Sequence, residues 1–206
     1  MNILRVTIKG RRISSVLIIF ILLLACKTDN KKINISQEPA PLETETSEDI
    51  LWHVKALHPE GKLLDVKAID ADGNKYDVKA IQNSDQTSLM DVKAFVKGKI
   101  LPVKVLVSED KFMPVKAIDD DGTIIDVKAI REDGTILDVK GVSQSGNIIH
   151  INAINTDGAF YNVEAISPQG WINDVKGIKM MKTPLEMTLN GVDVYAHIKS
   201  IPKANL

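Results

Sequence analysis

The chain has 206 residues, with 26 lysines and arginines against 27 aspartates and glutamates, and a formal net charge of −1. This balance, with no basic stripe, argues against a nucleic-acid-binding protein, because such proteins hold phosphates with clustered cations. The single cysteine excludes an intrachain disulfide, and the roughly 155 residues after residue 50 suffice for one domain with its own core.

The first 25 residues are expected to be a targeting signal. Basic residues precede an apolar run from Ile13 to Ala25, which is too short for a membrane-spanning helix. The run ends in Leu23-Leu24-Ala25-Cys26, which resembles the lipobox of bacterial lipoproteins, although Leu24 is larger than the usual residue there. The resemblance implies that the signal is removed and that Cys26 becomes the lipidated, palmitate-carrying first residue. An anchor helix with an incidental cysteine is the alternative.

The residues after the cysteine extend this expectation. By the same resemblance, the absence of aspartate at Lys27 fits sorting to the outer membrane, facing either the periplasm or the outside. Residues 26–49 are polar and include Pro39 and Pro41, which is typical of a disordered tether. We therefore expect a signal peptide at 1–25, a lipidated cysteine and tether at 26–49, and a β-repeat domain at 50–203.

From residue 50 onward the sequence consists of repeats of about twelve residues. Units starting at Pro114, Asp126 and Asp138 all read close to Asp-Val-Lys-Ala-Ile-x-x-Asp-Gly-Thr-Ile-Ile. Asp-Gly is a strong hairpin signal, the β-branched residues favour strands, and a glycine in every unit argues against a helix. The repeats predict an all-β, antiparallel meander of about twelve strands.

The charges of the repeat predict a register. If Gly134 closes a three-residue loop in the left-handed conformation, Lys128 lies opposite Asp138 and Asp126 opposite Lys140. One face of the sheet is then apolar, and the other has opposite charges across every strand boundary. Parallel stacking of identical units would instead place like charges together, which costs stability.

The irregular units bear on how the sheet closes. Asn83 to Met90 lengthens one turn, Met180 to Pro184 interrupts the pattern, and Pro102 and Pro114 replace the repeat's aspartate. A round barrel of twelve strands filled by small aliphatic side chains would leave a void. We therefore expect a flattened barrel or a two-layer sandwich, with a β-solenoid or a propeller-like arrangement as the alternative.

Two turns resemble the start of calcium-binding loops. Asp70 and Asp72 flank one Asp-Gly turn, and Asp119 and Asp121 flank another, so their oxygens are candidate calcium ligands. Neither turn has the closing glutamate of an EF-hand. Plain hairpin turns are favoured, so we expect no cofactor, with calcium at these turns as the alternative.

Histidines and aromatic residues are the remaining candidates. His53, His150 and His197 occupy the aspartate position of their repeats, and closure of the sheet could pair His53 with His197 at a metal. Solvated positions on the charged face are the alternative. Trp52, Trp171, Phe160 and Tyr161 are scattered through the repeats, which favours packing at sheet ends over a glycan platform.

No nucleophile–base grouping, phosphate loop or distinctive pair of carboxylates stands out, so we expect a protein that is not an enzyme. The Asp-Val-Lys-Ala-Ile repeats resemble those of uncharacterised repeat lipoproteins of Bacteroidota-type bacteria, a resemblance that implies no activity. The hypothesis is a non-catalytic, membrane-tethered envelope lipoprotein that acts as a scaffold for a protein partner and does not bind nucleic acid. A glycan- or calcium-binding module is the alternative.

Overall fold

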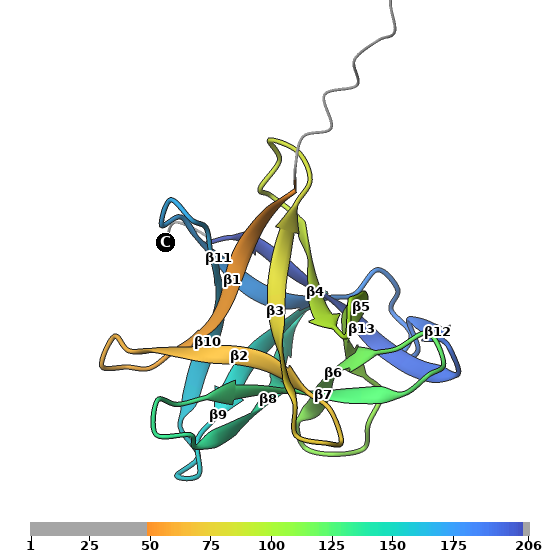
Figure 1. Ribbon diagram of the computed structural model, residues 1–206. Coiled ribbons are helices and arrows are strands. Elements are labelled where there is room, and N and C mark those ends of the chain that lie inside the picture. Colours follow the sequence, from red (N-terminus) through yellow and green to blue (C-terminus); the bar gives the residue numbers. More distant parts are fainter. Residues whose placement is uncertain (1–48, 204–206) are drawn as a thin grey trace, which may run out of the picture. The chain divides into compact units, whose positions relative to one another are not determined.

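The computed structural model describes residues 49–203, so the predicted signal peptide, Cys26 and nearly all of the predicted tether lie outside the described residues. The described part contains thirteen antiparallel strands and no helix, which confirms the predicted all-β meander (Figure 1). The strands are β1 (Ile50–Leu57), β2 (Leu63–Ile69), β3 (Lys75–Gln82), β4 (Met90–Val96), β5 (Lys99–Leu106), β6 (Met113–Ile118), β7 (Ile124–Ile130), β8 (Ile136–Ser145), β9 (Ile148–Ile154), β10 (Phe160–Ile166), β11 (Ile172–Ile178), β12 (Met187–Leu189) and β13 (Val192–Pro202). Among the described residues, no helix is long and apolar enough to cross a membrane.

Most of the hairpin turns contain a glycine in the left-handed conformation, which four of them place directly after an aspartate. Between β7 and β8, the amide of Arg131 donates to the carbonyl of Thr135 at 2.9 Å, and Gly134 has a φ of 85°. The side chain of Asp133 accepts a hydrogen bond from the amide of Thr135 at 2.9 Å. The predicted three-residue loop with a left-handed glycine is therefore confirmed.

The register that follows this turn is confirmed in its first half and wrong in its second. Lys128 pairs with Asp138 and Ile130 with Ile136, as predicted. Beyond Lys128 the two strands separate, because each turns toward β6. Asp126 pairs there with Lys116, and Lys140 pairs with Pro114, so the predicted contact of Asp126 with Lys140 does not form.

Three strands thus meet at a point, each pairing with the other two through its two halves. We call such a set a junction. The described residues form four: junction I contains β1, β2 and β3; junction II contains β4, β5 and β13; junction III contains β6, β7 and β8; and junction IV contains β9, β10 and β11. In Figure 1, β1 and β3 run side by side while β2 turns away from both.

The outer edge of each strand pairs with a strand of a different junction. Within the described chain these pairs are β1 with β10, β2 with β7, β3 with β4, β5 with β6, β8 with β9, and β11 with β13. Each junction is therefore joined once to each of the other three, which is the connectivity of a tetrahedron. The sheet closes around one core, as a flattened barrel or sandwich would, but it does so through junctions rather than along one seam or between two layers.

Most of the core consists of the valine and alanine of the repeats, joined by larger side chains such as Leu101 and Ile149. Along β7, Val127 is 3 % exposed and Ala129 is fully buried, while Asp126 and Lys128 point outward. Small side chains suit the crowded junction, and a void is avoided because four junctions converge on one interior. Two repeats have glycine in place of this alanine: a Cβ would lie 2.8 Å from Ile149 at Gly141 and 3.0 Å from Ile149 at Gly177.

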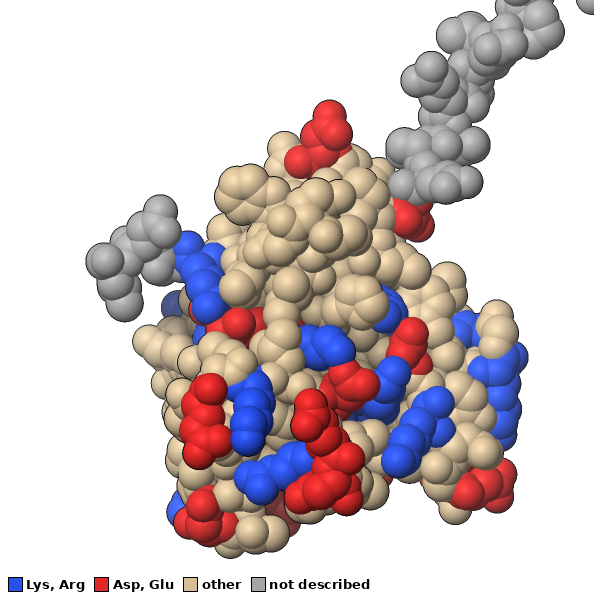
Figure 2. Space-filling view, turned by 60° about the vertical axis from the view of Figure 1, so that its left-hand side comes forward, with Lys and Arg blue, Asp and Glu red and all other residues tan. Residues whose placement is uncertain are grey.

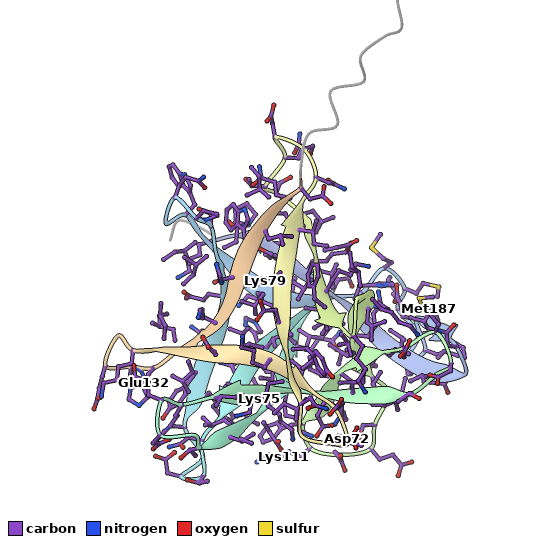
Figure 3. The ribbon with its side chains drawn as sticks, in the orientation of Figure 1. Asp72, Lys75, Lys79, Lys111, Glu132 and Met187 are labelled. Carbon is purple, nitrogen blue, oxygen red and sulfur yellow. The ribbon has the colours of Figure 1, made fainter. Side chains whose placement is uncertain are left out.

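On the outer face of a junction, the lysine of one strand donates a hydrogen bond to the aspartate of the next. In junction I, Lys55 bonds Asp65 and Lys67 bonds Asp77, while Lys79, labelled in Figure 3, lies 2.8 Å from Nδ1 of His53 and closes the ring. We call these sets charge rings. Junction III repeats the pattern with Lys116 on Asp126 and Lys128 on Asp138.

Between junctions, the charge pattern differs from the prediction. At four of the six strand pairs two lysines face each other: Lys67 and Lys128, Lys79 and Lys93, Lys104 and Lys116, and Lys176 and Lys199. The other two pairs set Lys55 opposite Glu164 and Lys140 opposite Asn152. Opposite charges across every strand boundary were therefore wrongly expected. Lys67 and Lys128 each donate to an aspartate of their own junction, which compensates the like charge across the strand pair. Figure 2 shows the result as interspersed acids and bases over much of one face.

The turn glycines allow a matched test of backbone strain. Gly122 and Gly134 both have a φ of 85°, but a Cβ at Gly122 would lie 2.4 Å from the carbonyl oxygen of Asn190, whereas a Cβ at Gly134 meets nothing within 4 Å. Gly134→Ala is expected to cost about 1–2 kcal/mol in left-handed strain. Gly122→Ala is expected to cost about 1–3 kcal/mol more, because the Asn190 loop must move. Urea denaturation of both variants measures the difference, and equal losses would contradict this packing.

The charge rings predict a loss of stability in acid. The hydrogen bond from Lys55 holds the pKa of Asp65 below its ordinary value, and Lys67 and Lys128 do the same for Asp77 and Asp138. A depressed folded-state pKa stabilises the fold above the unfolded-state pKa, about 4, and this stabilisation disappears as the pH falls through the folded-state pKa. The urea midpoint is therefore expected to drop below about pH 4. In a variant with all three aspartates changed to asparagine, this drop is expected to be smaller, and an unchanged drop would refute the ring contribution.

Candidate functional site

The first candidate calcium turn lies between β2 and β3, and hydrogen bonds within the turn already occupy the carboxylate of Asp70. Oδ1 of Asp70 accepts the amides of Asp72 at 3.0 Å and Asn74 at 2.9 Å. Oδ2 accepts the hydroxyl of Tyr76 at 3.0 Å and pairs with Lys97 at 3.1 Å. Desolvation raises the pKa of Asp70, but hydrogen bonds from Asn74, Lys97 and Tyr76 outweigh it and hold the pKa well below its ordinary value. Asp72, labelled in Figure 3, shares this turn.

In the second candidate turn, between β6 and β7, the aspartates likewise have protein partners. Asp119 pairs with Lys99 at 2.7 Å, and Asp121 accepts the amide of Thr123 at 2.8 Å. Lys97 and Lys99 come from one hairpin, so that hairpin neutralises an aspartate in each turn. Nowhere in residues 49–203 do three or more histidine, cysteine or acidic side chains gather as metal ligands. The geometry favours the role of these aspartates in hairpin turns.

The three repeat histidines lie at three different junctions. His53 is in β1 and bonds Lys79, while His197 is in β13 and lies 2.6 Å from Nζ of Lys104 through its Nδ1. His150 is in β9 and pairs with Lys176. The suggested meeting of His53 and His197 is therefore wrong. Each histidine instead occupies an acceptor position of a charge ring.

The two tryptophans, far apart in sequence, line one cleft of about 570 Å³. We call it the tryptophan cleft; its walls are Ile50, Trp52, Gln82, Thr87, Gln169, Trp171, Ile172, Asn173, Pro202 and Lys203. The start of β1, the β3–β4 turn, the β10–β11 turn and the end of β13 supply these residues. Three junctions therefore contribute to one surface site.

The two indoles differ in how the fold uses them. Trp52 is 3 % exposed and donates from Nε1 to Oε1 of Gln82 at 2.8 Å. Packing and this hydrogen bond fix its position in the wall of the cleft. Trp171 is 71 % exposed and packs into no core cluster. Ile50 and Ile172 beside it are 41 % and 43 % exposed. An apolar rim of this kind is typical of a binding surface.

Polar groups at the base of the cleft are ordered by the fold. The buried side chain of Asn173 donates to the carbonyl of Thr87 at 2.8 Å, which ties the β10–β11 hairpin to the β3–β4 turn. Lys203 pairs with the buried carboxylate of Glu164 at 2.6 Å. The lengthened turn at Asn83 to Met90, which the sequence marked as irregular, thus forms one wall of the site.

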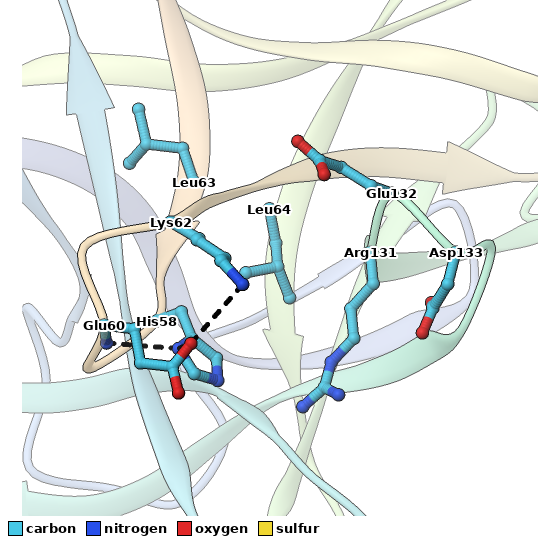
Figure 4. A pocket seen from close by; sticks show the side chains of 8 residues that line it. All are labelled: His58, Glu60, Lys62, Leu63, Leu64, Arg131, Glu132 and Asp133. Atoms are coloured by element: carbon cyan, nitrogen blue, oxygen red, sulfur yellow. Dashed lines mark hydrogen bonds and ion pairs between the residues drawn. The ribbon is translucent and has the colours of Figure 1, made fainter.

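A second pocket, of about 410 Å³, lies between the β1–β2 and β7–β8 turns (Figure 4). Its charged groups contact one another: Glu60 pairs with Lys62 at 3.4 Å, and Nδ1 of His58 accepts the amide of Glu60 at 3.1 Å. Nη2 of Arg131 donates to the hydroxyl of Tyr161 at 3.1 Å, beside the ring of His58. The aromatic ring of Tyr161 is 3 % exposed and belongs to the core. This pocket is less suited to a partner than the tryptophan cleft.

The sequence analysis singled out both tryptophans but did not predict that they line one cleft. One feature of the sequence could have indicated the cleft. Trp171 follows the turn glycine, where sister repeats have Thr123, Thr135 and Asn147, so an exposed aromatic residue replaces a polar one. A large apolar side chain at a solvated repeat position indicates a contact outside the repeat pattern.

Comparison with known proteins gives a family and no activity. No curated protein and no solved structure matches the chain. A model described as a family of unknown function, DUF7486, matches residues 48–201, which includes almost every repeat. The chain therefore belongs to the family DUF7486.

Proposed function

We propose that the protein is a non-catalytic, lipid-anchored protein of the bacterial cell envelope that binds a protein partner through the tryptophan cleft. The observation that carries the proposal is the exposure of Trp171, 71 %, on the rim of a cleft of about 570 Å³. Tryptophan is enriched among the residues that dominate protein–protein binding energy. An anchor at Cys26, with sorting to the outer membrane, is part of the proposal.

The position of the cleft supports a partner that is held in the same membrane as the protein. Ile50, the first residue of β1, lines the cleft, so the cleft lies at the N-terminal end of the described domain. A polar tether of residues 26–49 would reach roughly 25 Å on average. A partner held in the same membrane would then be within reach of Trp171 and Ile172.

The chemistry of the cleft supports binding rather than catalysis. Its lining contains indoles, amides and aliphatic side chains, and its one titratable member, Lys203, is paired with Glu164. A general acid or base needs a titratable side chain directed at the substrate. The described cleft therefore offers shape and apolar surface.

A neutral glycan is the second candidate ligand. Gln82 and Gln169 place amide groups beside Trp52 and Trp171, and polar groups next to aromatic walls are typical of small-ligand sites. Calcium is favoured less, because the carboxylate of Asp70 already accepts several hydrogen bonds.

Site-specific cross-linking in cells tests the protein partner. A photoreactive amino acid at Gln169, in the cleft, is expected to give a discrete protein adduct in the native envelope. The same amino acid at Glu132, on the other pocket, is the matched control and is expected to give none. Trp171→Ala is expected to abolish the adduct while leaving stability within about 0.5 kcal/mol, because the side chain is exposed. An adduct that survives Trp171→Ala, or equal adducts from both positions, would refute the proposed surface.

Tryptophan fluorescence distinguishes a glycan ligand from a protein partner. If the partner is a protein, titration of the protein with neutral envelope oligosaccharides is expected to leave the emission unchanged. A saturable change that disappears in Trp171→Ala would transfer the assignment to a glycan, because stacking of a sugar on the indole alters its surroundings. Trp52 remains in this variant and reports on whether the fold is intact.

A further inference from the structure

The four charge rings do not have the same charge. Junctions I and III each set three lysines against two aspartates: Lys55, Lys67 and Lys79 with Asp65 and Asp77, and Lys116, Lys128 and Lys140 with Asp126 and Asp138. In junction II, Pro102 and His197 take two of the three acceptor positions. The three lysines of that ring, Lys93, Lys104 and Lys199, therefore share one aspartate, Asp91, which makes junction II the most positive ring in the described chain.

The single aspartate of junction II serves two of the three lysines. Lys199 donates to Oδ1 of Asp91, and Nζ of Lys93 lies 3.7 Å from Oδ2. Among the described residues, no acidic side chain pairs with Lys104, whose Nζ lies 2.6 Å from Nδ1 of His197. Across the strand pair it faces Lys116, whose own partner is Asp126. Lys104 is thus a partly buried cation in a ring with excess positive charge.

The acidic group nearest to His197 does not cancel this charge. Oε1 of Glu186 lies 3.8 Å from Nε2 of His197, but the two oxygens of Glu186 accept the amides of Met180 and Met181 at 2.8 and 3.0 Å. Oε2 also lies 4.0 Å from Nζ of Lys179. Desolvation and the nearby Lys104 lower the pKa of His197, so the neutral imidazole is favoured and its Nδ1 accepts a hydrogen bond from Lys104.

The surroundings of Lys104 disfavour its charged form. Desolvation by burial, with repulsion from Lys93 and Lys199, lowers the pKa of Lys104 to about 8, and Asp91 opposes this only in part. An anion bound in the ring would reverse the repulsion and stabilise all three ammonium groups. Lysines act as point charges that hold phosphate well without requiring a fixed fork geometry.

We propose that junction II binds a phosphate group between Lys93, Lys104 and Lys199, in the place that aspartates fill in the other rings. The group is the phosphate of a soluble anion or of a lipid headgroup. None of the three lysines lines the tryptophan cleft, so this site does not depend on the proposed protein partner.

Competitive acetylation of the full-length protein, read lysine by lysine by mass spectrometry, tests the site. Inorganic phosphate at millimolar concentration is expected to slow acetylation of Lys104 in a saturable way and to raise its apparent pKa. Pro102→Asp restores the repeat's own residue opposite Lys93, and is expected to weaken phosphate binding at least about tenfold, because the added carboxylate competes for the ring. His197→Asp is expected to do the same beside Lys104.

Pro114→Asp is the matched control, since it makes the same change opposite Lys140 in junction III. It is expected to leave the protection of Lys104 unchanged. Vesicles of phosphatidylglycerol, compared with phosphatidylcholine, separate the sources. Protection by phosphatidylglycerol vesicles alone assigns the site to a lipid headgroup, and protection by inorganic phosphate assigns it to a soluble anion. The proposal is overturned if neither probe protects Lys104, or if Pro114→Asp weakens protection as much as Pro102→Asp.

Discussion

The fold depends on how three strands share one point. A strand such as β7 pairs three residues with β6 on one half and three with β8 on the other, so the strands must separate at the Val-Lys-Ala centre of the repeat. Space inside such a junction suits only small side chains, which explains the fully buried alanine beside a valine in most units. Outside, the separating strands bring the lysine of one repeat next to the aspartate of the next. In the repeat Asp-Val-Lys-Ala, valine and alanine therefore form the inner face of a junction, and aspartate and lysine form its outer face.

The local half of this structure could be predicted from the sequence, and the distant half could not. The turn at Gly134 and the pairing of Lys128 with Asp138 follow from residues within one hairpin. The pairing of Lys67 in β2 with Lys128 in β7 does not, because similar repeats offer similar edges and the sequence does not choose between them. The choice comes from the limited length of each strand and from closure of the whole sheet, which are properties of the complete chain.

The residues that break the repeat carry most of the information about individual sites. Glycine at 141 and 177, where the repeat has alanine, is explained by the side chain of Ile149, a contact between strands that the sequence alone does not reveal. Pro102 and His197 were noticed as substitutions of aspartate, but their effect is visible only when the ring they belong to is known. Trp171 was visible as an aromatic residue, while its neighbour Trp52 in the cleft is 119 positions away in the chain.

A closed set of junctions provides several sites from one repeated frame. Turns from different junctions meet at the surface, as the β3–β4 and β10–β11 turns do at the tryptophan cleft and the β1–β2 and β7–β8 turns do at the second pocket. The backbone of six of the turns is closed by the same pair of hydrogen bonds around a left-handed glycine, so side chains in these turns can change with little effect on the core. Function in such a domain is therefore expected to reside in substitutions at solvated repeat positions, where a new contact costs the fold little and alters only one surface.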